Sequence, residues 1–219
     1  MERIPEPELM DDPAQARAYA NADFSEPHQA FVERFTQCFP GHAPQRVLDL
    51  GCGAADITIR FARAYADCKL TGVDGAPAML ELAREAVARA GLVQRIRLSE
   101  ARLPASPLPR RTFDTVISNS LLHHLHAPQV LWRALTDHAA ARAAIFVMDL
   151  RRPDTRAQAC HLVDAYAGTE PEILKRDFFN SLLAAYRPEE VAAQLAQAGH
   201  SGLQVEAVGD RHLIVHGRL

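Results

Sequence analysis

Two acidic residues lie beside a glycine turn in the stretch VLDLGCGAADIT, which covers residues 47–58. The turn contains Gly51 and Gly53, and Asp56 occupies the position where a dinucleotide-binding turn carries its third glycine. A pyrophosphate needs positive potential here, so Asp49 and Asp56 favour a ligand with a cationic amino group. The two glycines allow the backbone to approach that ligand closely. The alternative is a plain strand–helix turn in which Asp56 caps the helix.

A third acidic residue, Asp74, ends the next apolar stretch, 23 residues after Gly51. At the carboxyl edge of an open parallel sheet, a carboxylate in this place can bind both hydroxyls of a ribose. Sites for dinucleotides and sites for ligands without phosphate both use an acid in this place, so Asp74 indicates a ribose but does not separate the two classes. The alternative is that Asp74 caps the helix that begins near Pro77.

These residues are positioned by strands and helices that alternate along the chain. Apolar runs predict strands over residues 46–50, 69–74, 94–101, 112–120 and 143–150. Apolar residues at helical spacing predict helices over residues 28–39, 54–66, 76–91, 127–140 and 187–200. A hairpin is expected over residues 203–217, around Gly209 and Asp210. The pattern predicts an α/β fold with a doubly wound seven-stranded sheet, mostly parallel with an antiparallel C-terminal hairpin.

The bulk composition narrows the classes of protein. A chain of 219 residues is long enough for one domain with a full core, and its net charge of −3 does not favour a long nucleic acid. The cysteines lack the paired spacing of metal ligands, and Cys160, His161 and Asp164 are too loosely spaced, so no metal site is expected. Without an apolar signal or a membrane span in the sequence, we expect a cytoplasmic protein, monomeric or homodimeric.

Four stretches in order resemble motifs I to IV of the class I S-adenosylmethionine-dependent methyltransferases, most closely the UbiE-like small-molecule group. They are VLDLGCGAADITIRFA (47–62), LTGVDGAPAMLELARE (70–85), RIRLSEARLP (95–104) and FDTVISNSLLHHL (113–125). The resemblance covers residues 44–150 and, through the hairpin, 187–217. It implies a Rossmann-like fold with S-adenosyl-L-methionine as the cofactor.

The resemblance also implies roles for single residues. Asp49, Gly51 and Gly53 would line the methionine part of the cofactor, and Asp74 would bind the ribose. Gly75 and Met79 would flank the adenosine, while Glu100 and Ala101 would bind the adenine through a carboxylate and a backbone N–H. The segment from Glu100 to Pro104 is one residue shorter than the family pattern, and its acid is Glu where the family has Asp.

Methyl transfer from a sulfonium is an in-line displacement that needs position and sometimes a base, but no metal. His123 and His124 follow the fourth strand and are candidates for that base, with structural packing as the alternative. Asn119 is a candidate for contact with the methionine part. Substrate-binding candidates are Tyr19, Arg151 and Tyr166, because in this family the N-terminal region and the insert after the fifth strand cover the acceptor.

The prediction is therefore a single methyltransferase domain over residues 1–219 that methylates a small molecule. Its expected parts are N-terminal lid helices (1–40), a cofactor-binding core (44–150), a substrate-lid insert (151–186), and a final helix with the hairpin (187–219). The alternatives are a non-catalytic cofactor-binding scaffold and an RNA or protein methyltransferase. A dinucleotide oxidoreductase is the least favoured, because of Asp49 and Asp56.

Overall fold

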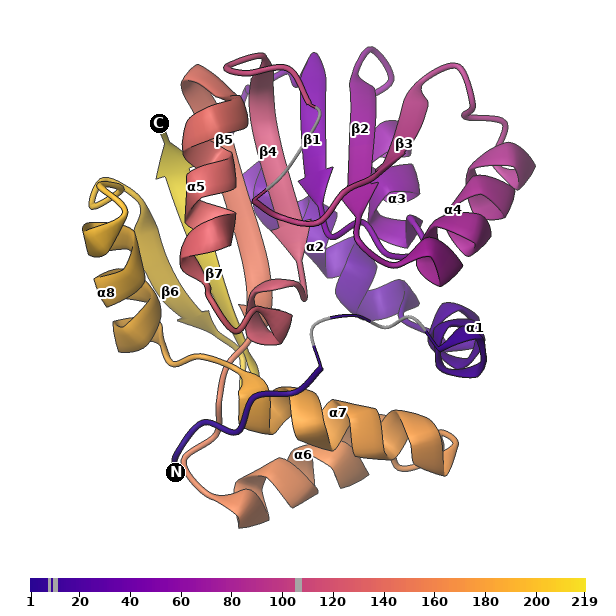
Figure 1. Ribbon diagram of the computed structural model, residues 1–219, viewed down its shortest axis with the longest axis vertical. Helices are drawn as coiled ribbons and strands as arrows, with labels where there is room; N and C mark the ends of the chain where they lie inside the picture. Colours follow the sequence, from indigo (N-terminus) through magenta and orange to yellow (C-terminus); the bar gives the residue numbers. More distant parts are fainter. Residues whose placement is uncertain (8, 10–11, 105–107) are drawn as a thin grey trace.

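A seven-stranded sheet with the strand order β3-β2-β1-β4-β5-β7-β6 forms the centre of the molecule (Figure 1). The structure is a computed structural model that describes residues 1–7, 9, 12–104 and 108–219. The strands are β1 (Arg46–Leu50), β2 (Lys69–Asp74), β3 (Ile96–Glu100), β4 (Phe113–Asn119), β5 (Ala139–Leu150), β6 (Gln204–Val208) and β7 (His212–Arg218). Strands β1 to β5 are parallel, and β7 pairs antiparallel with both β5 and β6. The predicted fold class is confirmed.

Helices lie on both faces of this sheet and beyond its carboxyl edge. They are α1 (Pro13–Asn21), α2 (Ser25–Cys38), α3 (Asp56–Ala64), α4 (Pro77–Arg89), η1 (Leu122–His124), α5 (Gln129–His138), α6 (Arg156–Ala167), α7 (Glu172–Ala184) and α8 (Pro188–Gln197). One core cluster joins the sheet to α5 and α8 and contains the fully buried Trp132. The other core cluster joins the sheet to α2, α3 and α4. In it the ring centroids of Phe35 and Phe61 lie 4.8 Å apart. Burial on both faces explains the apolar runs in the central strands, such as Ile145–Met148 in β5.

Two expectations from the sequence need adjustment. The insert over residues 151–186, in which polar and aromatic residues are mixed, is expected from the sequence to be irregular and largely helical. It folds into two regular helices, α6 and α7, which pack on each other. Strand β5 begins at Ala139, four residues before the predicted start, and its register against β4 shifts between Phe113 and Thr115. Arg142 has a φ of 63° in this irregular region, which a simple apolar pattern does not reveal.

The carboxyl edge of the parallel strands is covered by segments from both ends of the chain. In Figure 1, α7 lies across this edge above α6, and the N-terminal segment runs alongside α7 before it reaches α1. Arg3 fastens that segment, since its guanidinium donates to the carbonyls of His123, Leu125 and Ala184 and lies 4.1 Å from the ring centre of Tyr186. The covered edge is where an open α/β sheet binds ligands.

Candidate active site

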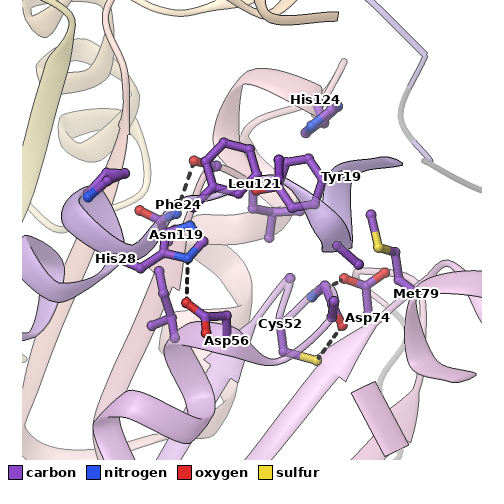
Figure 2. A pocket seen from close by; sticks show the side chains of 18 of the residues that line it. Tyr19, Phe24, His28, Cys52, Asp56, Asp74, Met79, Asn119, Leu121 and His124 are labelled. Atoms are coloured by element: carbon purple, nitrogen blue, oxygen red, sulfur yellow. Dashed lines mark hydrogen bonds and ion pairs between the residues drawn. The ribbon is translucent and has the colours of Figure 1, made fainter. Parts of the chain in front are cut away.

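A cavity of about 840 Å³ occupies this covered edge. Its floor is the ends of β1, β2 and β4 with the loops that follow them, and its walls come from α1, α2, α4 and α7. The volume is in the range of small-molecule and cofactor sites. Figure 2 shows Asp74 and Met79 on one side of the cavity and Asp56 with His28 on the other.

The turn after β1 requires its glycines for two different reasons. Gly51 and Gly53 have φ angles of 73° and 52°, which side chains seldom adopt. A Cβ on Gly51 would also lie 2.9 Å from the side chain of Leu121, so the two residues are in close contact. A Cβ on Gly53 would meet nothing within 4 Å, so that face of the turn is open to a ligand. The predicted close approach of a ligand to the backbone is therefore sterically available at Gly53.

Asp74 both shapes the turn and faces the cavity. One carboxylate oxygen accepts the backbone N–H of Gly53 at 2.9 Å, and the other accepts that of Ala76 at 2.8 Å. The capping alternative from the sequence is thus present, and it does not use up the acceptor capacity of either oxygen. Burial raises the pKa of Asp74, although the backbone hydrogen bonds act in the opposite direction. Its position remains compatible with binding a ribose.

Asp49 is a buried carboxylate that forms no ion pair with the described residues. Its side chain accepts a hydrogen bond from the Thr58 hydroxyl at 2.6 Å, and the residue is 3% exposed. Burial raises the pKa of Asp49 to about 7, and the nearby Asp74 acts in the same direction. Across residues 1–7, 9, 12–104 and 108–219, the ion pairs include neither Asp49 nor Asp74. A buried acid and a partly buried acid, neither with a positive partner among the described residues, favour a ligand that brings positive charge.

Asp56 differs from these two because its charge is already balanced. Its carboxylate lies 2.7 Å from both His28 Nδ1 and Arg60 Nε, and these hydrogen bonds lower its pKa although burial acts to raise it. Helix α3 begins at Asp56 after Ala55, and Ala55 makes no side-chain cap. The argument from the sequence that Asp56 repels a pyrophosphate is therefore weakened, and the negative potential comes from Asp49 and Asp74. His28 and Arg60 also line the cavity and were not identified from the sequence.

Only some of the residues expected to contact the adenine line the cavity. Gly75, Met79 and Ala101 line it, but the N–H of Ala101 donates to the Asp74 carbonyl at 3.0 Å and is not free for a ring nitrogen. Glu100 is exposed and absent from the described lining. In the alternation of β3 its side chain shares a face with Leu98 and does not turn over the strand end. This corrects the expectation for both residues.

Further residues line the middle of the cavity. Asn119 does so at the end of β4, and its amide donates to the Ser120 hydroxyl at 3.1 Å. The ring of Tyr19 packs on Phe24 with 4.8 Å between centroids. Enclosure, followed by the charges of the aspartates around it, raises the pKa of Tyr19 to about 12. The phenol is therefore a hydrogen-bond donor at neutral pH.

His123 and His124 differ sharply in their surroundings. His123 is 2% exposed, with its Nδ1 atom 2.5 Å from Asp149 and its Nε2 atom 3.5 Å from Glu6. Burial acts to lower the pKa of His123, but the Asp149 and Glu6 carboxylates outweigh it and raise the pKa. Burial and the neighbouring His123 lower the pKa of His124 to about 3. Both face the cavity, yet the hypothesis that one of them is a base gains no support from this arrangement.

The other two substrate candidates are separated by the fold. Tyr166 on α6 lines the cavity beside Arg211, whose guanidinium lies 3.3 Å from the centre of the Tyr166 ring. Its hydroxyl donates to Asp210 at 2.7 Å. Arg151 is absent from the described lining, because its side chain turns to the Asp210 carbonyl at the outer side of the hairpin. Beside Tyr166, the positive side chain that lines the cavity is therefore Arg211 and not Arg151.

The sheet order, the glycine turn and the acids at the carboxyl edge agree with the resemblance to the class I S-adenosylmethionine-dependent methyltransferases. Residues 47–144 match a family model described as a methyltransferase domain. The structure of an S-adenosylmethionine-dependent methyltransferase from Aquifex aeolicus superposes with a TM-score of 0.68 at 20% identity, covering 94% of this chain and 98% of the other. That likeness shows the fold.

Three curated relatives are similar over part of their length. Trans-aconitate 2-methyltransferase of Methylobacterium radiotolerans is 31% identical, covering 60% of this chain and 47% of the relative. Malonyl-[acyl-carrier protein] O-methyltransferase of Legionella pneumophila is 32% identical over 42% of this chain and 32% of the relative. The ubiquinone/menaquinone C-methyltransferase UbiE of Cronobacter sakazakii is 27% identical over 55% and 49%. The chain thus spans about half of these relatives or less. In the described part of the chain, no helix is both long and apolar enough to cross a membrane.

Proposed function

We propose that this protein transfers the methyl group of S-adenosyl-L-methionine to a small-molecule acceptor. The observation that carries the proposal is the pair of acids beside the open face of Gly53, the buried Asp49 and the partly buried Asp74. Neither has an ion-pair partner in the described part of the chain. A ligand with an ammonium and a sulfonium group supplies that positive charge. A ribose supplies hydroxyl donors for the acceptor capacity that Asp74 retains.

The residues present fit each part of this cofactor. Asp74 would bind the ribose hydroxyls, and Met79 with Leu103 would enclose the adenine in place of Glu100. Asp49 would face the ammonium group. His28 and Arg60 also line the cavity, but both are paired with Asp56, so they offer the carboxylate of the methionine tail only the donors that this pairing leaves. The bound cofactor contributes an activated methyl group on sulfur.

The chain itself contributes enclosure and orientation for this reaction. Tyr19, Phe24 and Leu121 line the middle of the cavity, and their surfaces exclude water from the site of transfer. Aromatic rings also stabilise a neighbouring sulfonium through its positive charge. Position and desolvation are the main means of accelerating a displacement that needs no covalent intermediate.

The acceptor would lie at the end of the cavity between η1, α6 and α7. We propose a carboxylate-bearing small molecule as its class. Arg211 is a positive side chain in this wall, stacked on Tyr166, and can bind an anionic group in a fork geometry. The names of two relatives, trans-aconitate 2-methyltransferase and malonyl-[acyl-carrier protein] O-methyltransferase, also denote acidic acceptors.

Calorimetry with S-adenosyl-L-methionine tests the cofactor, and turnover tests the acceptor. We expect saturable binding of the cofactor and release of S-adenosylhomocysteine with a panel of di- and tricarboxylic acids. The same panel includes amines and phenols of similar size. Absence of binding at millimolar cofactor would refute the proposed function. Turnover confined to amines or phenols would retain methyl transfer and refute the acceptor class.

Arg211 provides a sharper test of the acceptor class. The variant Arg211→Gln should raise KM for an acidic acceptor by about 10-fold, since a charged hydrogen bond contributes roughly 1.5–3 kcal/mol. Affinity for the cofactor should not change, because Arg211 lies on the hairpin side of the cavity. Arg156→Gln, at an exposed position of α6, is the matched control. An equal KM in both variants would remove Arg211 from the acceptor site.

A further inference from the structure

Three potential metal ligands from distant parts of the sequence meet beside the acceptor end of the cavity. The Oε1 atom of Glu6 lies 3.5 Å from Nε2 of His123 and 3.4 Å from Nδ1 of His124. One ligand atom from each residue lies within 4.8 Å of the other two. Glu6 is partly buried and His123 is fully buried, so this cluster is not an exposed acidic patch.

The distances in this cluster are longer than those of the other histidine–carboxylate pairs in the described part of the chain. In the same molecule, the pair His28–Asp56 closes to 2.7 Å and the pair His216–Glu206 to 2.9 Å. Charged N–H···O hydrogen bonds are typically about 2.7–2.9 Å long. The Oε1 atom of Glu6 lies almost equally far from the two ring nitrogens, and neither distance is as short as such a hydrogen bond. Ligand atoms about 2.0–2.2 Å from a shared ion are themselves roughly 3.0–3.5 Å apart, which the Glu6 distances match.

Neighbouring groups hold these ligand atoms in place. Nδ1 of His123 is bound to Asp149, so its Nε2 atom is directed at Glu6. Histidines that bind a metal commonly donate their other N–H to a carboxylate in this way. The hydroxyl of Ser181 donates to the Oε1 atom of Glu6 at 3.0 Å. Arg3, three residues before Glu6, anchors the segment to the carbonyls around η1.

We propose that Glu6, His123 and His124 form a binding site for a divalent transition-metal ion, with Zn²⁺ as the reference ion. Two imidazoles and one carboxylate are a common protein ligand set for zinc and for iron, and they leave positions for water or an oxygen of the acceptor. Calcium and magnesium prefer ligand sets made of oxygen. The proposal goes beyond methyl transfer, which needs no metal, and it does not depend on the identity of the acceptor.

Metal titration of the whole chain tests this site directly. After treatment with a chelator, the protein is titrated with Zn²⁺ at pH 8 in a buffer that does not bind metals, and with Co²⁺ for its visible spectrum. We expect one equivalent of Zn²⁺ bound with a dissociation constant in the micromolar range or below. Glu6→Gln and His124→Gln should each weaken binding at least 10-fold. His161→Gln, which removes an exposed histidine of α6, should leave it unchanged.

Two results would overturn the proposal. One is the absence of binding below millimolar Zn²⁺ in the wild-type protein, and the other is equal affinity in the wild type and in Glu6→Gln. Cofactor binding by the same variants shows that they are folded. It also separates a failure of the proposed metal site from a failure of the proposed function. Should a variant not fold, the spectrum of Co²⁺ on the wild-type protein decides, because nitrogen and oxygen ligands in a low-symmetry site intensify its bands over those of hydrated Co²⁺.

Discussion

Cofactor binding should release a proton from Asp49, and this makes the affinity depend on pH. The carboxyl is buried, accepts one hydrogen bond from Thr58, and has a pKa of about 7 without a ligand. A cationic group beside it favours the ionised form and lowers that pKa. Binding therefore draws on the ionised fraction, which is about 9% at pH 6 and about 76% at pH 7.5. Affinity should rise about eightfold between these two pH values.

Calorimetry in two buffers of different ionisation enthalpy measures both quantities at once. At pH 7 the free carboxyl is half protonated, so up to about half a proton should be released for each cofactor bound. The variant Asp49→Asn is nearly isosteric and cannot ionise. Its affinity should be lower at pH 7.5 and should lack the eightfold rise. If Asp49→Asn shows the same rise and the same proton release as the wild type, the reasoning about this buried acid is wrong.

Further outcomes follow from Asp49 and from two other residues. Because the pKa of Asp49 is raised, the protein without ligand should lose stability as pH rises from about 4 to 7. At pH 8 the variant Asp49→Asn should therefore have a free energy of unfolding higher than that of the wild type by about 1–4 kcal/mol, as measured by urea denaturation. Asp74→Ala should weaken cofactor binding at least 10-fold, since a charged hydrogen-bond pair contributes roughly 1.5–3 kcal/mol. The control variant Asp67→Ala, at an exposed position, should bind the cofactor as the wild type does. Equal affinities in the two variants would show that Asp74 does not bind the cofactor. Arg3→Ala should lower the free energy of unfolding by about 1.5–3 kcal/mol, because it removes a charged donor from three carbonyls, whereas the exposed Arg17→Ala should change it little.

The sequence was sufficient where a local pattern determines the structure. The apolar strands around Val47 and Val73 and the turn at Gly51 are specified by neighbours in the chain, and they were predicted closely. Asp74 was placed correctly at a strand end for the same reason. Local patterns work here because strand burial and turn geometry depend on the residues immediately around them.

The sequence was insufficient where two distant segments meet. Nothing near Asp56 in the sequence reveals that His28 lies 2.7 Å from its carboxylate, and nothing near Glu6 shows that it reaches His123 across 117 positions of the chain. The position of Glu100 also escaped prediction, because the side on which a strand-end residue emerges depends on the pairing register of β3 with β2. Such contacts are set by tertiary packing, which a motif of ten residues does not encode.

The contact of Leu121 with Gly51 has a kinetic consequence. Leu121 packs against the turn on which the cofactor would rest, and it stands immediately before the helix η1 that carries His123. Because a packed contact of this kind resists separate movement, a cofactor seated on the turn also fixes the floor beneath the acceptor. We therefore expect a compulsory order of binding in which the donor precedes the acceptor. Inhibition by S-adenosylhomocysteine should be competitive toward the donor and not toward the acceptor.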